Sequence, residues 1–465
     1  MNNRTLISAA VAAALVLPVG AHAETADIAE IKRTLEQMRA DYEERIAELE
    51  AEDAYKASEA DEQPAYGAVT SGTKFNPQIS LILNGNYYAD SIDGEGVERF
   101  GAADGIHDAH GHDDGHGDEH GGLEQGFNLS DTELVFSATV DPYFDATANL
   151  AVSSDGNVEL EEAWLQTRGL PAGLKVKAGK FFSDIGYANN QHPHQWDFAD
   201  QNLAYLNLLG DHGLRDTGAQ VTWLPDWDTY TLFGLELLQG EQEKLGALVG
   251  HDDDLNLDEK DRGPRLTTAF VKLSPDLGFS HALQLGGWGA WAGQHQETHE
   301  LDEPDEHALQ GDASMWGLET VYKYDAGRGY GAGNIKLQAE YLWQRKDLDI
   351  VHAEAPEVIG AGRRFTQDGF YIQGLYGIAP RWQAGLRYDR TGLFENVKES
   401  GGTTLEEYDD SDRWTAALSW TPSEFSRLRL QYSIADMSVE GERDSFNTLY
   451  LQYTMSLGAH GAHKF

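Results

Sequence analysis

The feature that most constrains how this chain can fold is a period-two alternation of apolar and polar residues, repeated from residue 76 to residue 465. Alternation of this kind puts every second side chain on the same face of a β-strand. Each run lasts about ten residues, which is the length that a tilted strand needs to cross a bilayer. The clearest runs lie at 79–83, 134–140, 144–152, 316–324, 335–343, 414–420, 428–434 and 449–457.

The connections between these runs are of two kinds, short and mostly long. Proline and glycine mark seven short turns, at 141–142, 170–173, 224–226, 274–276, 325–329, 379–380 and 421–423. Eight other connections lie at 91–126, 153–157, 183–212, 241–263, 295–312, 348–364, 392–411 and 437–444. Seven turns and eight loops predict about sixteen strands.

The fold class that follows is all-β: a transmembrane antiparallel β-barrel of about sixteen strands over residues 76–465, with the longer loops outside. A soluble β-sandwich also contains many strands. A sandwich would not normally place its long loops on one side. Nor would it carry so many tryptophan and tyrosine residues at strand ends, where outer-membrane barrels have aromatic girdles.

The two ends of the chain indicate export to the bacterial outer membrane. Residues 1–23 are typical of a secretory signal peptide, with Arg4 before the apolar middle and a small-x-small cleavage site at 21–23; an uncleaved anchor is the alternative. No later run is long and apolar enough for a spanning helix, and the absence of cysteine excludes a disulfide scaffold. The last run keeps its phase to the terminal Phe465, an ending that the barrel-assembly machinery commonly recognises. Membrane lipid and this machinery are therefore the expected partners.

Residues 24–60 carry a heptad pattern that predicts a short periplasmic coiled coil. A helix of this length is marginal alone, so association is expected, and we predict a homotrimer. The alternative is a single amphipathic helix lying on the barrel. Residues 61–75 then form a linker with proline and glycine as breakers.

Charge is concentrated in a few segments. The formal net charge is −44, and −36 of it lies in the segments 24–63, 91–126, 241–263, 295–312 and 392–412. An acidic surface repels nucleic acid and attracts cations, so we expect no nucleic-acid partner. The alternative is that the acidic loops serve only solubility or a salty habitat.

Several stretches of the barrel resemble proteobacterial outer-membrane proteins often labelled zinc-regulated outer-membrane receptors, and more distantly phosphate-selective porins. The resemblance implies a porin-like barrel and a link to zinc supply. The label sometimes adds a TonB-dependent receptor-like role, but such receptors have larger barrels with an N-terminal plug domain. Here only about fifty mature residues precede the first strand. The matching stretches are 76–85, 170–200, 380–390, 422–432 and 451–465, the last (LQYTMSLGAHGAHKF) being the most specific.

The first long loop, 91–126, combines histidine and acidic residues with glycines between them. Imidazole and carboxylate groups bind zinc, nickel and copper without thiolates. We therefore predict weak binding of several ions, zinc among them, with no cofactor required; one ordered site and plain solvation are the alternatives. The candidate ligands are His107, His110, His112, His116, His120, Asp108, Asp113, Asp114 and Asp118.

Most other histidines also fall in predicted outer loops, a distribution that points to the outer face as the metal-binding side. They are His192, His194, His212, His251, His295, His299, His307 and His352.

The loop 183–212 is the candidate constriction, because in porins one long loop often folds into the lumen; an outside flap is the alternative. It contains His192, His194 and Asp197. Both signs of charge occur in the lumen phase, so the pattern defines no ion selectivity, although a phosphate pore should show more base than acid. The basic candidates are Lys175, Lys177, Lys336, Arg387, Arg427 and Arg429, and the acidic ones are Glu133, Glu319, Glu340 and Asp389.

Three functions fit these observations. The first is a porin-like channel for small solutes or ions, linked to acquisition of zinc or another divalent metal through the first loop. The second is a surface metal-scavenging protein that uses the barrel as an anchor, and the third is an anion- or phosphate-selective porin. The sequence contains no G-x-S-x-G, H-E-x-x-H or phosphate-loop motif, so we expect no enzyme and assign no catalytic residue.

Overall fold

The computed structural model describes residues 77–101, 123–242, 244–258, 263–299, 307–439 and 442–458. The predicted signal peptide, coiled coil and linker lie outside these residues. The nine candidate metal ligands of the first loop, which lie within residues 107–120, are also outside the described residues. The same is true of the C-terminal residues 459–465.

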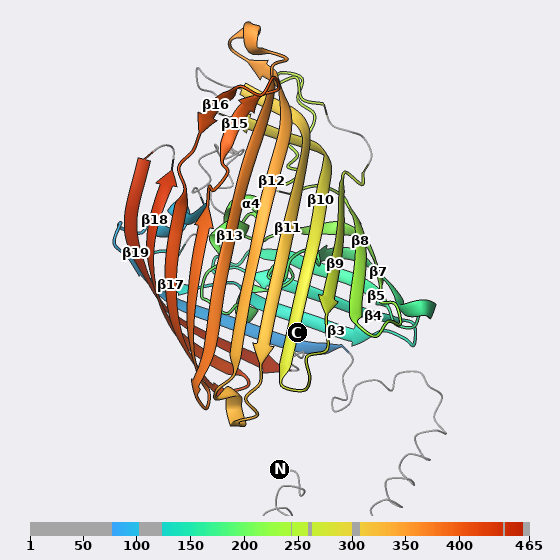
Figure 1. The fold of residues 1–465 in the computed structure, drawn as a ribbon, viewed down its shortest axis with the longest axis vertical. Coiled ribbons are helices and arrows are strands. Elements are labelled where there is room, and N and C mark those ends of the chain that lie inside the picture. The colour runs from blue at the N-terminus through green and yellow to red at the C-terminus, as the bar shows by residue number, and fades with distance from the viewer. Residues whose placement is uncertain are drawn as a thin grey trace, which may run out of the picture. The chain divides into compact units, whose positions relative to one another are not determined.

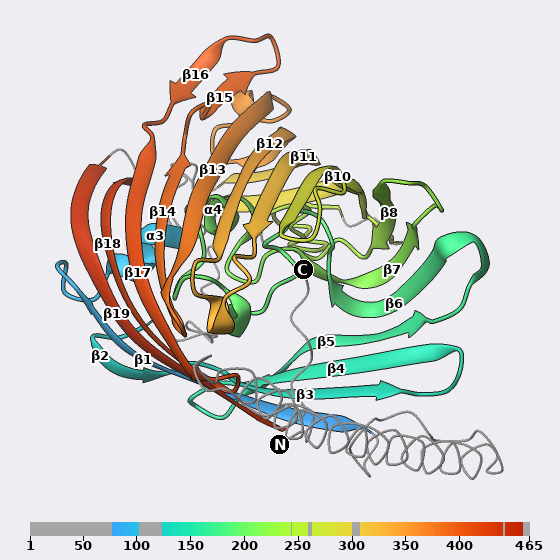
Figure 2. The ribbon, with the colours of Figure 1, turned by 60° about the horizontal axis from the view of Figure 1, so that its bottom comes forward.

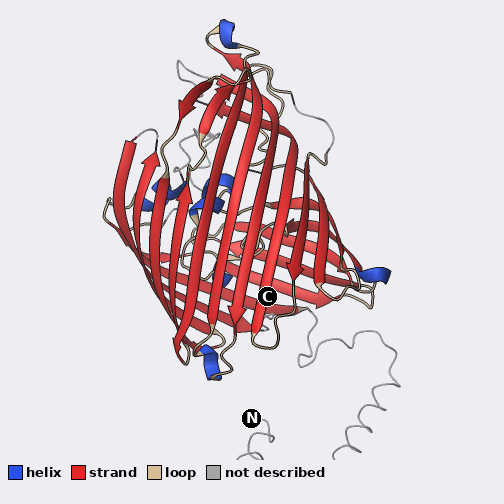
Figure 3. Ribbon diagram, viewed as in Figure 1, coloured by secondary structure: helices blue, strands red, loops and turns tan. Residues whose placement is uncertain are grey.

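Sixteen antiparallel strands close into a barrel, because β1 pairs with β3 on one side and with β19 on the other (Figures 1 and 3). This confirms the predicted fold class and strand number. The wall strands are β1 (Gln78–Asp90), β3 (Thr132–Thr139), β4 (Phe144–Val152), β5 (Val158–Thr167), β6 (Leu174–Phe182), β7 (Arg215–Trp223), β8 (Tyr230–Leu238), β9 (Leu266–Ser274), β10 (His281–His299), β11 (His307–Tyr324), β12 (Ile335–Ala353), β13 (Gly362–Ala379), β14 (Trp382–Thr391), β17 (Ser411–Ser423), β18 (Ser426–Val439) and β19 (Glu442–Gly458).

Three short strands and several short helices complete the described elements. The strand β2 (Gly126–Leu129) pairs with β1, next to the part of β1 that pairs with β3. The strands β15 (Asn396–Glu399) and β16 (Thr404–Glu407) form a hairpin, and β15 pairs with β13. The helices are α3 (Gly96–Gly101), α4 (Leu203–Leu209) and the 3-10 turns η1 (Pro171–Gly173), η2 (Pro193–Gln195), η3 (Gly329–Gly331) and η4 (Pro356–Val358). Among the described residues, no helix has the length and apolar character needed to cross a membrane.

The two faces of the wall differ in chemistry. On β17, Trp414 is half exposed on the outer face, whereas its neighbours Arg413 and Thr415 are fully buried on the inner face. The same alternation holds on β13, where Ile372 is exposed and Tyr371 and Gln373 are buried. An apolar outside and a polar inside are the reverse of a soluble barrel and match a strand wall that faces lipid. The chain is therefore an outer-membrane β-barrel.

The seven predicted turns all connect strands, but four predicted loops are shorter than expected. Strand pairing extends into 295–312, 348–364 and 437–444, and the loop 392–411 contains the β15–β16 hairpin. These segments are polar, so their sequence is typical of a loop. They are nevertheless paired, because antiparallel strands can continue beyond the bilayer wherever a neighbouring strand completes their backbone hydrogen bonds.

The prediction that the histidines mark the outer loops is wrong for several of them. His299, His307 and His352 lie on strands. His295 lies on β10 with no exposed surface, where its ring contacts Glu297 at 2.7 Å and accepts hydrogen bonds from the backbone of 246–247. His192 and His194 are buried, each at less than a tenth exposed. Histidine tolerates burial when both ring nitrogens have partners. A histidine in a polar stretch of sequence can therefore be buried in the fold.

Candidate functional site

The segment 183–214, between β6 and β7, lies inside the barrel. Its helix α4 contacts β12, β13 and β14, which are far from β6 and β7 along the ring. Figure 2 shows α4 on the inner side of these strands. The segment is called the inner loop below. Its position answers the choice between lumen and outside flap that the sequence left open, while its use as a constriction stays a prediction.

Local sequence explains how the inner loop holds its shape. The amide of Asn189 donates to the carbonyls of Ser183 and Leu214 at 2.8 and 2.9 Å, which ties the two ends of the loop together. Asn202 caps α4 by accepting a hydrogen bond from the backbone of Tyr205 at 3.0 Å. A capping asparagine satisfies one of the free N–H groups at a helix start.

One anchor of the inner loop is a buried ion-pair network around Asp200. Its two carboxylate oxygens accept from Arg387 on β14 at 2.7 Å and from Arg413 on β17 at 3.0 Å. Asp389 contacts the same two arginines at 2.9 and 3.2 Å. Burial alone would raise the pKa of Asp200, but the guanidinium groups of Arg413 and Arg387 lower it below its usual value. The charged form is thus the one that holds the loop to the wall.

A second anchor is Glu340 on β12, which is almost completely buried. Its carboxylate accepts from the backbone N–H groups of Tyr187 and Ala188, both at 2.9 Å, and from the hydroxyl of Tyr205 at 2.8 Å. The hydroxyl of Tyr371 on β13 donates to it as well. A carboxylate with four donors is well compensated for the cost of its burial.

Basic side chains of the wall hold the middle of the loop. Arg427 donates to the carbonyl of His194 at 2.8 Å, and Arg429 donates to the carbonyl of Trp196 at 2.6 Å. Lys336 lies 2.6 Å from Asp197. An apolar cluster adds to these polar contacts. It includes Ala204, Tyr205, Leu208 and Leu209 of the loop and Trp288, Met315 and Leu342 of the wall.

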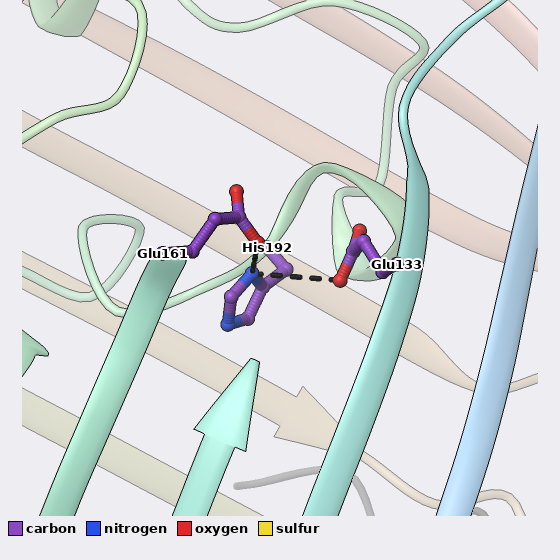
Figure 4. Close-up of side chains that lie close together, drawn as sticks. All are labelled: Glu133, Glu161 and His192. Carbon is purple, nitrogen blue, oxygen red and sulfur yellow. Dashed lines mark ion pairs between the residues drawn. The ribbon is translucent and has the colours of Figure 1, made fainter. Parts of the chain in front are cut away.

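A separate group of polar side chains gathers where the inner loop meets β3, β4 and β5. His192 Nδ1 lies 3.6 Å from Glu133 Oε2 and 3.4 Å from Glu161 Oε2, as Figure 4 shows. Nε2 of the same ring lies 3.0 Å from Glu162 Oε2, and His194 Nδ1 lies 2.8 Å from Glu133 Oε1. These residues, together with Asn149 on β4, are called the His192 cluster below.

A β-bulge explains why two consecutive glutamates both reach His192. Asn149 pairs with Glu162 and Leu150 pairs with Leu160, which leaves Glu161 as the extra residue on β5. A bulge turns an additional side chain to one face of a sheet. Burial alone would lower the pKa of His192, but hydrogen bonds to Glu161 and Glu162 and the charge of Glu133 raise it to about 10.

Two cavities lie at the end of the barrel that carries the short turns. The larger has a volume of about 690 Å³ and is lined by His194, Arg427 and turn residues such as Arg381 and Glu424. The other, of about 420 Å³, lies beside Asp184 and Asp197 of the loop. Its basic wall residues are Lys272, Lys323 and Lys336.

Most of the predicted constriction residues meet at the inner loop. Arg387, Arg427, Arg429 and Lys336 contact the loop as described above, and Lys177 lies 3.5 Å from Asp184. Lys175 is exposed instead, near the start of β6. Of the predicted lumen acids, Glu133 belongs to the His192 cluster, Glu340 and Asp389 hold the loop, and Glu319 lies 3.6 Å from Lys272.

Sequence reasoning missed several residues of the site, chiefly Asp200, Arg413 and Glu161. Arg413 lies in the lumen phase of an alternating strand, which is a signal that could have been used. Glu161 lies where the alternation breaks, between Leu160 and Glu162. Such a break marks a bulge, but the partner that the bulge serves is visible only in the fold.

Several solved outer-membrane proteins and a protein known from its sequence are similar to this chain. No family model matches the chain. The outer membrane channel DcaP of Acinetobacter baumannii matches 83% of this chain and 100% of its own, with 13% identity and a TM-score of 0.49. A trimer form of OmpT, an outer membrane protein of Vibrio cholerae, matches 82% and 99%, with 11% identity and a TM-score of 0.47. The anion-selective porin from Comamonas acidovorans matches 82% and 99%, with 10% identity and a TM-score of 0.45.

Similarity at this level does not show which solute this chain transports or how many copies assemble. The resemblance to zinc-regulated receptors stays a prediction. The sequence relative is an uncharacterized protein of Aquifex aeolicus (strain VF5), 33% identical over 438 residues. The match covers 93% of this chain and 86% of the relative, and so includes nearly the whole barrel. The chain therefore belongs to the same protein family as this uncharacterized protein of Aquifex aeolicus.

Proposed function

We propose that the protein is a passive outer-membrane channel for small hydrophilic solutes, with the inner loop setting the width of the passage. The observation that carries this proposal is the inner loop itself, which is anchored at Asp200 and Glu340 inside a closed barrel of sixteen strands. A barrel of about this size has room for an aqueous channel. The polar inner wall suits water and hydrophilic solutes.

A second candidate, preference for anionic solutes, is favoured by the charges around the two cavities. Lys272, Lys323 and Lys336 line the smaller cavity beside two aspartates. Arg381 and Arg427 line the larger one beside a single glutamate. Basic side chains lining a pore attract anions. A reversal potential measured across a potassium chloride gradient tests this preference, and a cation-selective sign would exclude it.

Solute uptake by reconstituted vesicles tests the channel proposal. Proteoliposomes that contain the purified protein should swell in isotonic solutions of small sugars, faster for smaller sugars, because the inner loop limits the size of the solute. Protein-free liposomes are the control. If the proteoliposomes swell no faster than the control with any sugar, the barrel is an anchor and the metal-scavenging alternative is favoured. The link to zinc supply is tested separately, by measuring whether expression rises when zinc is withdrawn.

A further inference from the structure

We infer that the His192 cluster is a binding site for one divalent transition-metal ion, held by Glu133, Glu161, His192 and the side-chain oxygen of Asn149. This site lies inside the barrel and is distinct from the histidine-rich first loop. Metal binding here does not depend on the channel role, so it goes beyond the proposed function.

The spacing of His192 Nδ1 from the two carboxylate oxygens fits a metal site as well as it fits long hydrogen bonds. Metal–ligand bonds of about 2.0 to 2.2 Å in a tetrahedral site place neighbouring ligand atoms about 3.3 to 3.6 Å apart. The distances from His192 Nδ1 to Glu133 Oε2 and Glu161 Oε2 are 3.6 and 3.4 Å. All three residues are buried, each at less than a tenth exposed.

Asn149 supplies the fourth corner of this arrangement. Its Nδ2 atom lies 3.3 Å from Glu133 Oε2, 2.9 Å from Glu161 Oε2 and 3.2 Å from His192 Nδ1. Asn149 is 1% exposed, and its Oδ1 atom has no hydrogen-bond partner among the described residues. A half-turn of the amide exchanges the two atoms, which brings Oδ1 to the corner that Nδ2 now holds.

The hydrogen bonds of this cluster leave one polar atom over. Asn149 Nδ2 lies within hydrogen-bond distance of both carboxylates and of the His192 ring, whereas Asn149 Oδ1 has no partner among the described residues. A metal ion could use all four groups, because carboxylate oxygens, a ring nitrogen and an amide oxygen all donate electron pairs to it.

His192, Glu133 and Glu161 each have a further hydrogen-bond partner on the side away from the proposed metal. His192 Nε2 lies 3.0 Å from Glu162 Oε2, and Glu133 Oε1 lies 2.8 Å from His194 Nδ1. Glu161 Oε1 accepts from Arg215 at 3.4 Å. Metal ligands typically have such outer partners, which fix their orientation. His194 also lines the larger cavity, so the cluster lies next to a space that small ions can enter.

Zinc titration of the folded barrel in detergent tests the inference. The background protein has His107, His110, His112, His116 and His120 all changed to Ala, so that the first loop contributes no histidine. This background should bind one Zn²⁺ per chain in calorimetry, and Co²⁺ should give the visible absorption of a four-coordinate site. Adding His192→Ala should weaken Zn²⁺ binding by about 100-fold or more, since loss of an outer partner alone costs about 10- to 100-fold.

Two further variants separate a metal site from a merely structural cluster. His281→Ala removes a histidine at the first position of β10, at the end of the strand that follows a short turn, where its ring contacts Tyr322. This variant should leave zinc affinity unchanged. Asn149→Asp keeps the size of the side chain and adds a charge, so it should tighten Zn²⁺ binding by about 10-fold. If the background binds no zinc, or if His192→Ala binds it as tightly as the background, the site does not exist. If Asn149→Asp does not bind more tightly, Asn149 is not the fourth ligand. Retained heat-modifiable gel mobility shows that each variant is folded.

Discussion

At the scale of single residues, Asp200 is the position of the inner loop whose one carboxylate contacts two buried arginines, Arg387 and Arg413. We predict that Asp200→Asn loosens the loop, since breaking a buried ion pair costs up to about 3 to 5 kcal/mol. Of the carboxylates that contact Arg387 and Arg413 in the described residues, Asp389 alone would then remain, beside the loop carbonyls of Asp200 and Gln201. Single-channel conductance should rise, and the reversal potential should shift toward anions because the lumen loses one negative charge beside two arginines.

The matched control is Asp226→Asn, which removes the same charge from an exposed turn. It should leave both conductance and selectivity close to those of the parent protein. If Asp200→Asn gives the same recordings as Asp226→Asn, the ion-pair network does not position the loop.

A second prediction concerns Gly186 of the inner loop, which packs closely against Tyr205 and Glu340. Its φ is +63°, and a Cβ atom there would lie 2.0 Å from the hydroxyl of Tyr205 and 2.7 Å from Glu340 Oε2. Gly186→Ala should therefore cost about 1 to 3 kcal/mol in strain and displace Tyr205 from Glu340. Limited proteolysis should then cut the inner loop faster than in Gly169→Ala, where a Cβ meets open space. Equal cleavage rates in the two variants would show that the close packing at Gly186 is not needed.

At the scale of elements, the strands, the turns and most of the wall residues that contact the inner loop followed from local sequence, whereas the pairing of loop residues with wall residues did not. Alternation and the proline or glycine turns predict the wall because each strand's pattern reflects only which face meets lipid. The place of the inner loop depends on partners such as Arg387, 187 positions from Asp200 along the chain. The His192 cluster likewise joins β3, β5 and the loop. Contacts of this kind leave no periodic signal in the sequence.

The pairing between β5 and β6 is predicted to be a weak part of the barrel wall. Only four residue pairs join these strands, from Ala163–Lys180 to Gln166–Lys177, whereas nine pairs join β8 and β9, which have similar lengths. Fewer paired amides mean lower local stability. In hydrogen–deuterium exchange, amides of 158–162 should exchange faster than those of β8. Equal protection of the two segments would contradict this weak pairing.

At the scale of the whole molecule, the outer apolar face places the barrel in a membrane, and the heptad pattern of residues 24–60 favours association of several copies. We predict a homotrimer that weakens when residues 24–60 are deleted, because the coiled coil would hold the subunits together. Native mass spectrometry of the full mature protein and of the deletion variant measures this. A monomer in the full mature protein would end the prediction.

We propose that the inner loop, held inside the barrel, sets the width of a channel. Single-channel recording in planar bilayers tests it most directly, with the parent protein beside a variant in which residues 187–209 are replaced by a short glycine–serine linker. Heat-modifiable gel mobility should first show that both barrels are folded. We predict discrete conductance steps for the parent and steps several-fold larger for the variant. Equal conductance in the two proteins, or none in either, would contradict the claim.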